Sequence, residues 1–212
     1  RINECIDQWH TYVLAEGQWH SHSYEGYRPV AVDWTAIWRF KLQGWSGKLF
    51  NGLLGRAVRG IGFGLVCQVG QVDGHRMPLL RQVIRTRQKD RSEAQLKADT
   101  LRWVKHHLDA SEVAIIDAGV EISDMQAIEM PQYVIRMALN CTGRRNYLPA
   151  YKGRGCHPKW GEKVRPLSRT HLENVIEATP PDKCETIHFE GRDIAVHGWS
   201  DLISPIYKPG EA

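Results

Sequence analysis

Two aspartates in this chain of 212 residues stand at the ends of short apolar runs, where they could bind metal ions. Asp33 lies near the end of the run 30–35, Val-Ala-Val-Asp-Trp-Thr, and Asp117 closes the run 113–117, Val-Ala-Ile-Ile-Asp. An ionised carboxylate beside a core is costly unless it is paired or binds a metal, although a single acid at a strand end is more often a turn or cap residue. Open α/β sheets place their ligand sites at strand ends. If the two strands are neighbours, both carboxylates could hold Mg²⁺ or Mn²⁺ in one site.

Such a site is suited to a phosphodiester substrate. Two divalent ions about 4 Å apart can activate a water molecule or a 3′-hydroxyl and stabilise the leaving oxygen. The sequence has neither a G-x-S-x-G motif, which would indicate a serine nucleophile, nor a G-x-x-x-x-G-K-[ST] loop, which would indicate a nucleotide phosphate site. The five cysteines are widely spaced without a C-x-x-C pair, which argues against structural zinc and favours reduced thiols in a cytoplasm.

The elements that would position the two acids can be assigned from apolar periodicity and turn signals. Apolar residues at spacings of three and four predict a helix over 2–15. Ser92 and Gln95 form a capping-box pattern that opens a helix ending at about Leu108, and Asp73-Gly74 predicts a hairpin turn. The remaining patterns predict a loop at 17–29, strands at 30–35, 58–72, 75–85, 113–117, 133–139 and 202–206, a short helix at 124–129, and a hairpin of 186–189 with 193–197. This order favours an α/β fold (mixed α+β) in which helices pack on the faces of a mixed sheet.

Positive charge is concentrated in one stretch of the sequence. Residues 141–169 carry eight lysines and arginines against a single acid, Glu162, while the whole chain has a formal net charge of only +4. A near-neutral body with a concentrated basic segment is typical of proteins that bind polyanions, although a solvated loop would look the same. The candidate DNA-binding residues are Arg144, Arg145, Lys152, Arg154, Lys159, Lys163, Arg165 and Arg169. Aromatic residues between them, among them Trp160, could stack on an unpaired base or anchor the segment to the body.

The ordered set formed by Val30–Thr35, the turn at Asp73-Gly74 and Val113–Gly119 resembles the catalytic domain of DDE-type insertion-sequence transposases. In that family, which has a ribonuclease-H-like fold, the first acid lies on the first strand and the second closes the strand after the first helix. The basic stretch 153–161 is similar to a segment that follows the next strand in some members. The resemblance covers roughly residues 29–205. It implies a partial ribonuclease-H-like core over 29–140, preceded by a helix and linker at 1–28 and followed by a basic, β-rich insertion at 141–212.

The resemblance implies a metal-dependent endonuclease that cleaves phosphodiesters and transfers strands at transposon ends, with Asp33 and Asp117 as metal ligands. The family's third acid, a glutamate on a later helix, has no match here. Glu173 and Glu177 fall in a possible short helix and Glu190 falls in a hairpin, but none has the expected neighbours. The chain is therefore expected to be a fragment, which would bind metal weakly and cut DNA poorly on its own.

Two alternatives stay open: another ribonuclease-H-like nuclease of the resolvase or repair type, and a non-catalytic DNA-binding module derived from a transposase. Under the leading hypothesis the partner is DNA, and assembly on two DNA ends implies a homo-oligomer. The sequence has no run of 18 apolar residues and no signal pattern, so neither a membrane partner nor secretion is expected. A prokaryotic cytoplasm, with attachment to the nucleoid through DNA, is the expected location.

Overall fold

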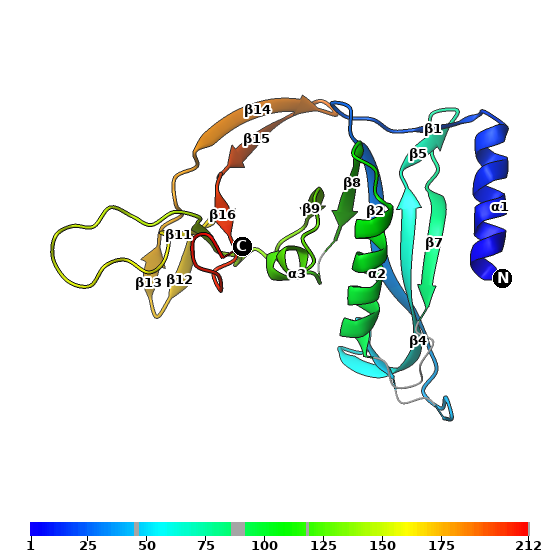
Figure 1. Cartoon of the computed structure of the whole chain (residues 1–212), viewed down its shortest axis with the longest axis horizontal. Helices are drawn as coiled ribbons and strands as arrows, with labels where there is room; N and C mark the ends of the chain where they lie inside the picture. Colours follow the sequence, from blue (N-terminus) through cyan, green and yellow to red (C-terminus); the bar gives the residue numbers. More distant parts are fainter. Residues whose placement is uncertain (45–46, 86–91, 118, 212) are drawn as a thin grey trace. The chain divides into compact units, whose positions relative to one another are not determined.

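The computed structural model describes residues 1–44, 47–85, 92–117 and 119–211. The chain divides into two compact units, one made of Arg1–Val120 with Ala127–Arg136 and the other of Glu121–Gln126 with Met137–Ala212. Each unit has its own sheets (Figure 1). No helix in these described ranges combines the length and the apolar character needed to cross a membrane.

A mixed sheet is the centre of the first unit. Its strand order is β3-β4-β2-β8-β9, and β7 pairs with β4 as well. Strand β4 runs antiparallel to β2 and β7, whereas β8 runs parallel to β2 and β9 runs parallel to β8. The strands are β2 (Arg28–Trp38), β3 (Lys48–Asn51), β4 (Arg56–Gln68), β7 (Leu79–Arg85), β8 (Glu112–Ile116) and β9 (Tyr133–Ile135).

One face of this sheet is covered by α2 (Glu93–His107). The predicted capping box is confirmed, because the Ser92 hydroxyl accepts a hydrogen bond from the Gln95 backbone N–H and the Gln95 side chain accepts one from the Ser92 backbone N–H. The helix packs closely on β4 at Gly64, where an added Cβ would lie 2.1 Å from the Thr100 Oγ1. Since Thr100 is fully buried, the absence of a side chain at this glycine sets how closely the helix approaches the sheet.

The first helix, α1 (Ile2–Ala15), agrees with the prediction and packs against β7. Its residue Val13 forms a small core with Trp19 and Leu79, and the Trp19 indole donates to the Met77 carbonyl at 2.8 Å. Trp19 belongs to β1 (Trp19–Ser21), which pairs with β5 (Gly70–Val72) and through it with β6 (His75–Arg76). The prediction of a loop throughout 17–29 was therefore wrong, whereas the turn at Asp73-Gly74 is confirmed, with both residues at positive φ.

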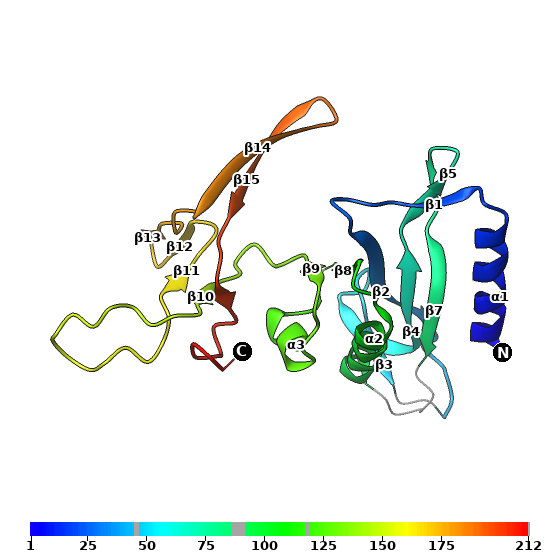
Figure 2. The ribbon, with the colours of Figure 1, turned by 45° about the horizontal axis from the view of Figure 1, so that its top comes forward.

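The second unit is built from short strands and hairpins, and most of α3 (Ile122–Ala127) belongs to it. Its one three-stranded sheet among the described residues has the order β11-β10-β16. The predicted hairpin is confirmed as β14 with β15, and it extends without a further strand beside it (Figure 2). The strands are β10 (Gly143–Arg145), β11 (Lys163–Val164), β12 (Arg169–His171), β13 (Asn174–Ile176), β14 (Lys183–Phe189), β15 (Arg192–Gly198) and β16 (Leu202–Ile203).

Candidate functional site

Asp33 lies within a long strand rather than near the end of a short one. Strand β2 continues to Trp38, because residues 33–38 stay paired with residues 60–65 of β4. The side chains of β2 alternate in direction, so Val32 is buried against the α2 side of the sheet while Asp33 is exposed on the opposite side. The predicted strand at 30–35, with Asp33 near its end, was therefore too short.

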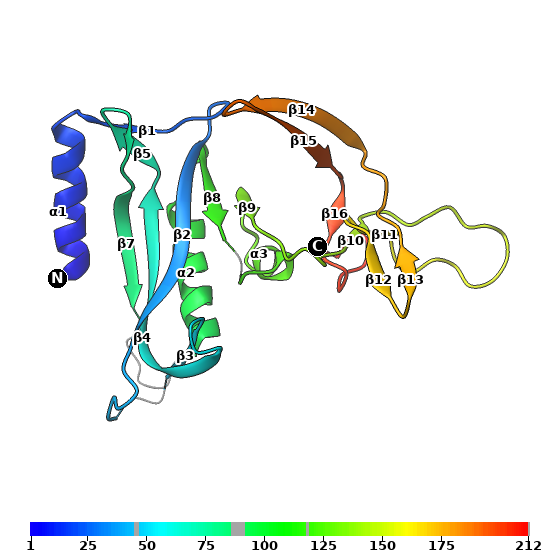
Figure 3. The ribbon, with the colours of Figure 1, turned by 180° about the vertical axis from the view of Figure 1, so that it is seen from behind.

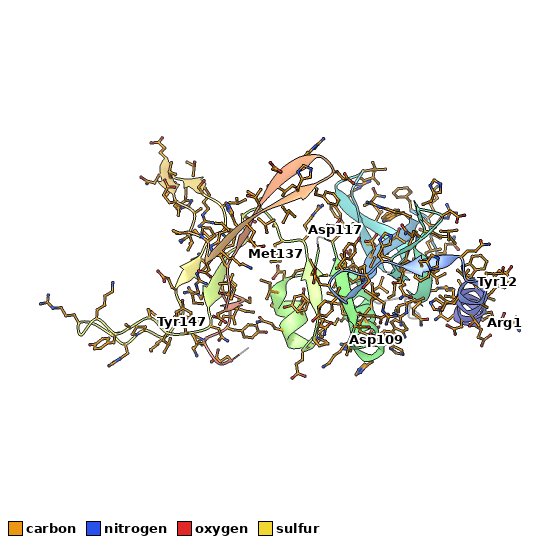
Figure 4. The ribbon with its side chains drawn as sticks, turned by 90° about the horizontal axis from the view of Figure 1, so that it is seen from above. Arg1, Tyr12, Asp109, Asp117, Met137 and Tyr147 are labelled. Atoms are coloured by element: carbon orange, nitrogen blue, oxygen red, sulfur yellow. The ribbon has the colours of Figure 1, made fainter. Side chains whose placement is uncertain are left out.

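The parallel pairing of β2 with β8 brings the two acids together. Val32 and Ile116 are register partners; Asp33 is the next residue on β2, and Asp117 is the first residue after the end of β8. Neighbouring strands lie about 4.8 Å apart, and residues in register on them point to the same face. Both aspartates are exposed; β2 and β8 run side by side in Figure 3, and Asp117 is labelled in Figure 4. The condition set by the sequence, that the two strands be neighbours, is fulfilled.

An arginine extends this pair into a row of three charged residues. Ile116 is also the register partner of Ile135 on β9, and Arg136 directly follows β9 as Asp117 directly follows β8. The Arg136 Nε lies 2.9 Å from the Asp117 Oδ1, with both side chains mostly exposed. The row Asp33, Asp117 and Arg136 therefore consists of the residues that follow register partners of three adjacent strands, with the arginine paired to Asp117.

Two further contacts define the surroundings of Asp33. Its Oδ1 accepts a hydrogen bond from the Trp34 backbone N–H at 2.8 Å. On the neighbouring strand β4, burial raises the pKa of the Cys67 thiol, and the negative charge of Asp33 raises it further. The thiol is therefore neutral at physiological pH and lies close enough to sense the carboxylate.

A lysine from α2 reaches the segment that follows Asp117. The Lys97 Nζ donates to the Gly119 carbonyl at 3.1 Å, pairs with Glu93 at 3.1 Å and lies 5.9 Å from the centre of the Trp34 ring. Neither Lys97 nor Arg136 was singled out from the sequence. Arg136 had a usable signal, because it falls within the predicted strand 133–139, and only its register with Asp117 was missing.

A third acidic ligand does not accompany the pair. Within the described ranges, no three His, Cys, Asp or Glu side chains are placed to hold one metal ion. The possible short helix around Glu173 and Glu177 was wrong, because β12 and β13 form a hairpin whose turn contains Glu173 at φ 62°. Glu190 occupies the turn of the next hairpin at φ 48°. All three glutamates belong to the second unit.

The eight basic candidates of the second unit fall into three groups. Lys152, Arg154 and Lys159 are exposed on the long connection between β10 and β11, whose side chains stand out beyond Tyr147 in Figure 4. Arg144, Lys163, Arg165 and Arg169 form the second group and are half-buried or exposed. Burial lowers the pKa of Lys163, and the positive charges of the other three members lower it further. These four cations therefore lie close together.

Arg145 alone forms the third group and stabilises the unit instead of presenting a free charge. It is 8% exposed, and its two terminal nitrogens lie 2.5 and 2.7 Å from the Asp182 carboxylate. The Arg145 guanidinium also donates a hydrogen bond to the Ser200 backbone carbonyl at 2.8 Å. These contacts hold the pKa of Asp182 well below its usual range, with the Arg145 hydrogen bond as the main cause. We therefore exclude Arg145 from the candidate DNA contacts, because its guanidinium is already engaged on both nitrogens.

No family model, curated protein or solved structure matches this chain. A function must therefore be argued from the site itself. The carboxylates of Asp33 and Asp117 supply hard oxygen ligands of the kind that Mg²⁺ and Mn²⁺ prefer. Arg136 competes for Asp117, so binding an ion through that residue has to displace or share the ion pair.

Proposed function

We propose that this chain is part of the catalytic region of a DDE-type DNA transposase with a ribonuclease-H-like fold. Asp33 and Asp117 are two of its acids for Mg²⁺ or Mn²⁺, and its substrate is the phosphodiester backbone of DNA. The observation that supports the proposal is the register of β2 with β8, in which Asp33 and Asp117 each directly follow one of the register partners Val32 and Ile116. In the family that the sequence resembles, the first acid lies on the first strand of the sheet and the second closes the strand after the first helix; here Asp33 lies on β2, and Asp117 directly follows β8, the strand after α2.

The chemistry expected of this site is the attack of an oxygen nucleophile on phosphorus. A bound divalent ion would lower the pKa of a coordinated water and offset the charge that develops on the phosphate oxygens. Asp33 and Asp117 orient that ion from two parallel strands, which fixes their backbone positions relative to each other. Arg136, with its charge one strand further on, is placed to contact a phosphate oxygen once Asp117 is committed to the ion.

The exposed basic residues of the second unit support DNA as the partner. Seven of the eight candidates remain after Arg145 is set aside. Cations on a protein surface bind the backbone phosphates of DNA and release counterions, so the affinity falls steeply with salt. A non-catalytic DNA-binding module is the competing candidate, and the absence of a third acid beside the pair within the described residues favours it. The two candidates differ in whether metal ions bind at the acids.

Direct titration with Mn²⁺, followed by the loss of its free-ion electron paramagnetic resonance signal, separates the two candidates. The variants are Asp33→Asn and Asp117→Asn, each of which removes one charge and keeps the side-chain shape. Asp7→Asn is the matched control, because Asp7 is exposed on α1 in the same unit. With two protein ligands, binding is expected in the millimolar range, abolished by both site variants and retained by the control.

The proposal is rejected if Mn²⁺ does not bind, or if it binds equally well to the wild type and to both site variants. Either result would leave a DNA-binding module without catalytic ions. A structure determined in Mn²⁺ gives an independent answer. It should show an ion within about 2.1–2.2 Å of a carboxylate oxygen from each aspartate.

A further inference from the structure

A pocket in the second unit is lined by positive and polar side chains. It has a volume of about 310 Å³, at the low end of the range of about 300–1,000 Å³ typical of small-molecule sites. Arg165 and Arg169 contribute guanidinium groups, and Thr142 and Ser168 contribute hydroxyl groups. No acid is present among the described residues that line it.

The positive charge at this pocket is not neutralised within the described part of the chain. No ion pair joins Arg165 or Arg169 to any acid there, in contrast to Arg145 with its Asp182 partner. Burial lowers the pKa of Lys163, and the nearby charges of Arg165, Arg169 and Arg144 lower it further. Arg144 and Lys163 are also register partners on β10 and β11, and like charges in that position destabilise a sheet. Four cations that lie close together repel one another, and a bound anion would reduce this repulsion.

Hydrogen-bonding capacity is also left unused beside the pocket. Among the described residues, the Nε atoms of Arg165 and Arg144 are buried without a hydrogen-bond partner, although the Arg144 Nη1 donates to the Gly161 carbonyl at 3.0 Å. Buried donors without a partner cost free energy, so each points to a group that the protein alone does not supply. A phosphate has several acceptor oxygens, and the planar guanidinium matches two of them at once.

The pocket has an apolar side as well. Leu139 and Leu167 line it and are 84% and 52% exposed. Exposed leucines at the rim of a cationic pocket suit a ligand that has an apolar surface next to its phosphate. The sugar and base of a nucleotide unit have this character, whereas a bare inorganic anion does not.

We propose that this pocket binds one backbone phosphate of a nucleic-acid strand. Arg165 and Arg169 hold the phosphate oxygens with help from the Thr142 and Ser168 hydroxyls, and the two leucines support the adjoining nucleoside. Lys163 and Arg144 extend the positive surface to neighbouring phosphates. The inference deepens the proposed function, on which it rests for the choice of DNA as the polyanion, but it requires neither metal ions nor the acids of the first unit.

The test is a binding measurement on the full chain with a 5′-fluorescein-labelled 20-nucleotide DNA, single-stranded and as a duplex, followed by fluorescence anisotropy in EDTA. The pocket variant is Arg165→Gln with Arg169→Gln. The matched control, Lys183→Gln with Arg192→Gln, removes the same charge from exposed positions of the same unit that are not among the candidate DNA contacts. Because Arg169 is exposed, the single variant Arg169→Gln should fold normally and guards against a loss caused by unfolding. Sodium pyrophosphate serves as a competing free anion.

The pocket variant should lose about tenfold to a hundredfold in DNA affinity, as expected when charged hydrogen bonds to a phosphate are removed. Its salt slope on duplex DNA should fall by about 0.9, the value for one phosphate contact. Arg169→Gln alone should lose part of this DNA affinity, and the control variant should lose much less. Equal losses in the pocket and control variants would mean that only net charge matters and would overturn the proposal. So would pyrophosphate binding that the pocket variant abolishes while its DNA affinity is unchanged.

These outcomes are independent of the metal titration. If Asp33→Asn and Asp117→Asn abolish Mn²⁺ binding while the pocket variant binds DNA normally, the pocket assignment fails and the proposed function stands. If the pocket variant loses DNA binding while no ion binds at the acids, the pocket stands and the catalytic proposal fails.

Discussion

Replacing Asp33 by asparagine should make the metal-free protein more stable, which is the opposite of what a structural acid would show. Asparagine keeps an Oδ1 acceptor for the Trp34 backbone N–H, now bonded at 2.8 Å, so the substitution removes little besides the charge. The charge removed is one of two like charges that directly follow register partners of β2 and β8, and the backbones of paired strands lie about 4.8 Å apart. Its loss relieves repulsion from Asp117 and sacrifices no ion pair found in the described residues, since Arg136 is paired with Asp117.

The size of the effect follows from the exposure of both carboxylates. Two unit charges about 5 Å apart repel by about 0.8 kcal/mol in bulk water and by about 3 kcal/mol at an effective dielectric constant of 20. Exposure favours the lower figure, and salt and the Arg136 charge reduce it further. We expect a gain of about 0.5–1 kcal/mol in the free energy of unfolding, or a Tm higher by about 1–4 °C for a chain of this size.

Thermal unfolding followed by circular dichroism, first in EDTA and then in 10 mM Mn²⁺, measures both halves of the prediction. A ligand at ten times its Kd stabilises the folded state by about 1.4 kcal/mol, so a millimolar site should raise the wild-type Tm by about 3–5 °C. Asp33→Asn should gain nothing from Mn²⁺. The order of stability should therefore reverse between the two buffers, and Asp7→Asn should follow the wild type in both.

Two results would refute the reasoning. A lower Tm of Asp33→Asn in EDTA would mean that the carboxylate has a structural role that asparagine cannot fill. An equal response of the wild type and the variant to Mn²⁺ would mean that the ion binds elsewhere.

Three other substitutions test separate parts of the structure. Arg136→Gln removes an exposed ion pair worth about 0.2–1 kcal/mol and should raise the Mn²⁺ affinity by up to about fivefold; lower affinity would contradict competition for the acid. Gly64→Ala would place a Cβ 2.1 Å from the Thr100 Oγ1 and should cost about 1–3 kcal/mol in urea unfolding, which Thr100→Gly in the same chain should partly restore. The pKa of Asp182 is lowered in the folded state by Arg145, so this pair stabilises the protein above about pH 4 and its contribution is lost as the pH falls below that value. Asp182→Asn should lower the Tm at pH 7 and flatten its acid dependence; an unchanged profile would contradict the assignment.

Elements with local signals could be predicted from the sequence. The helix at 2–15, the capping box at Ser92 and the turns at Asp73-Gly74 and Glu190-Gly191 depend on residues close together in the chain, and the structure has them where they were expected. Strand β2 was predicted too short, because Thr35–Trp38 is held as a strand by the distant residues Gly60–Phe63. Strand β1 was missed for the same reason, since its partner β5 lies about fifty residues further along.

In the candidate site, too, the residue types could be predicted from the sequence, whereas the contacts between distant residues could not. The type and placement of Asp33 and Asp117 beside apolar residues could be seen in the sequence. Their adjacency depends on the parallel pairing of β2 with β8, a long-range contact that no local pattern encodes. The parallel pairing of β8 with β9 brings Arg136 next to Asp117, although Arg136 looked like an ordinary strand residue in the sequence. Arg145 and Arg165 likewise looked alike, and only the bond from Arg145 to Asp182 separates a structural arginine from one whose charge is available.

The charges of the acid row lead to one more consequence of the proposed function. Asp33, Asp117 and Arg136 together carry one negative charge, so without metal the row repels a phosphodiester. One divalent ion makes the row positive by one, and a phosphodiester then neutralises it. DNA contact at the acids therefore requires the ion, whereas contact at the pocket of the second unit does not. The DNA affinity should accordingly have two separable parts. One depends on Mn²⁺ and is lost in Asp33→Asn, and the other persists in EDTA, falls with salt and is lost when Arg165 and Arg169 are replaced.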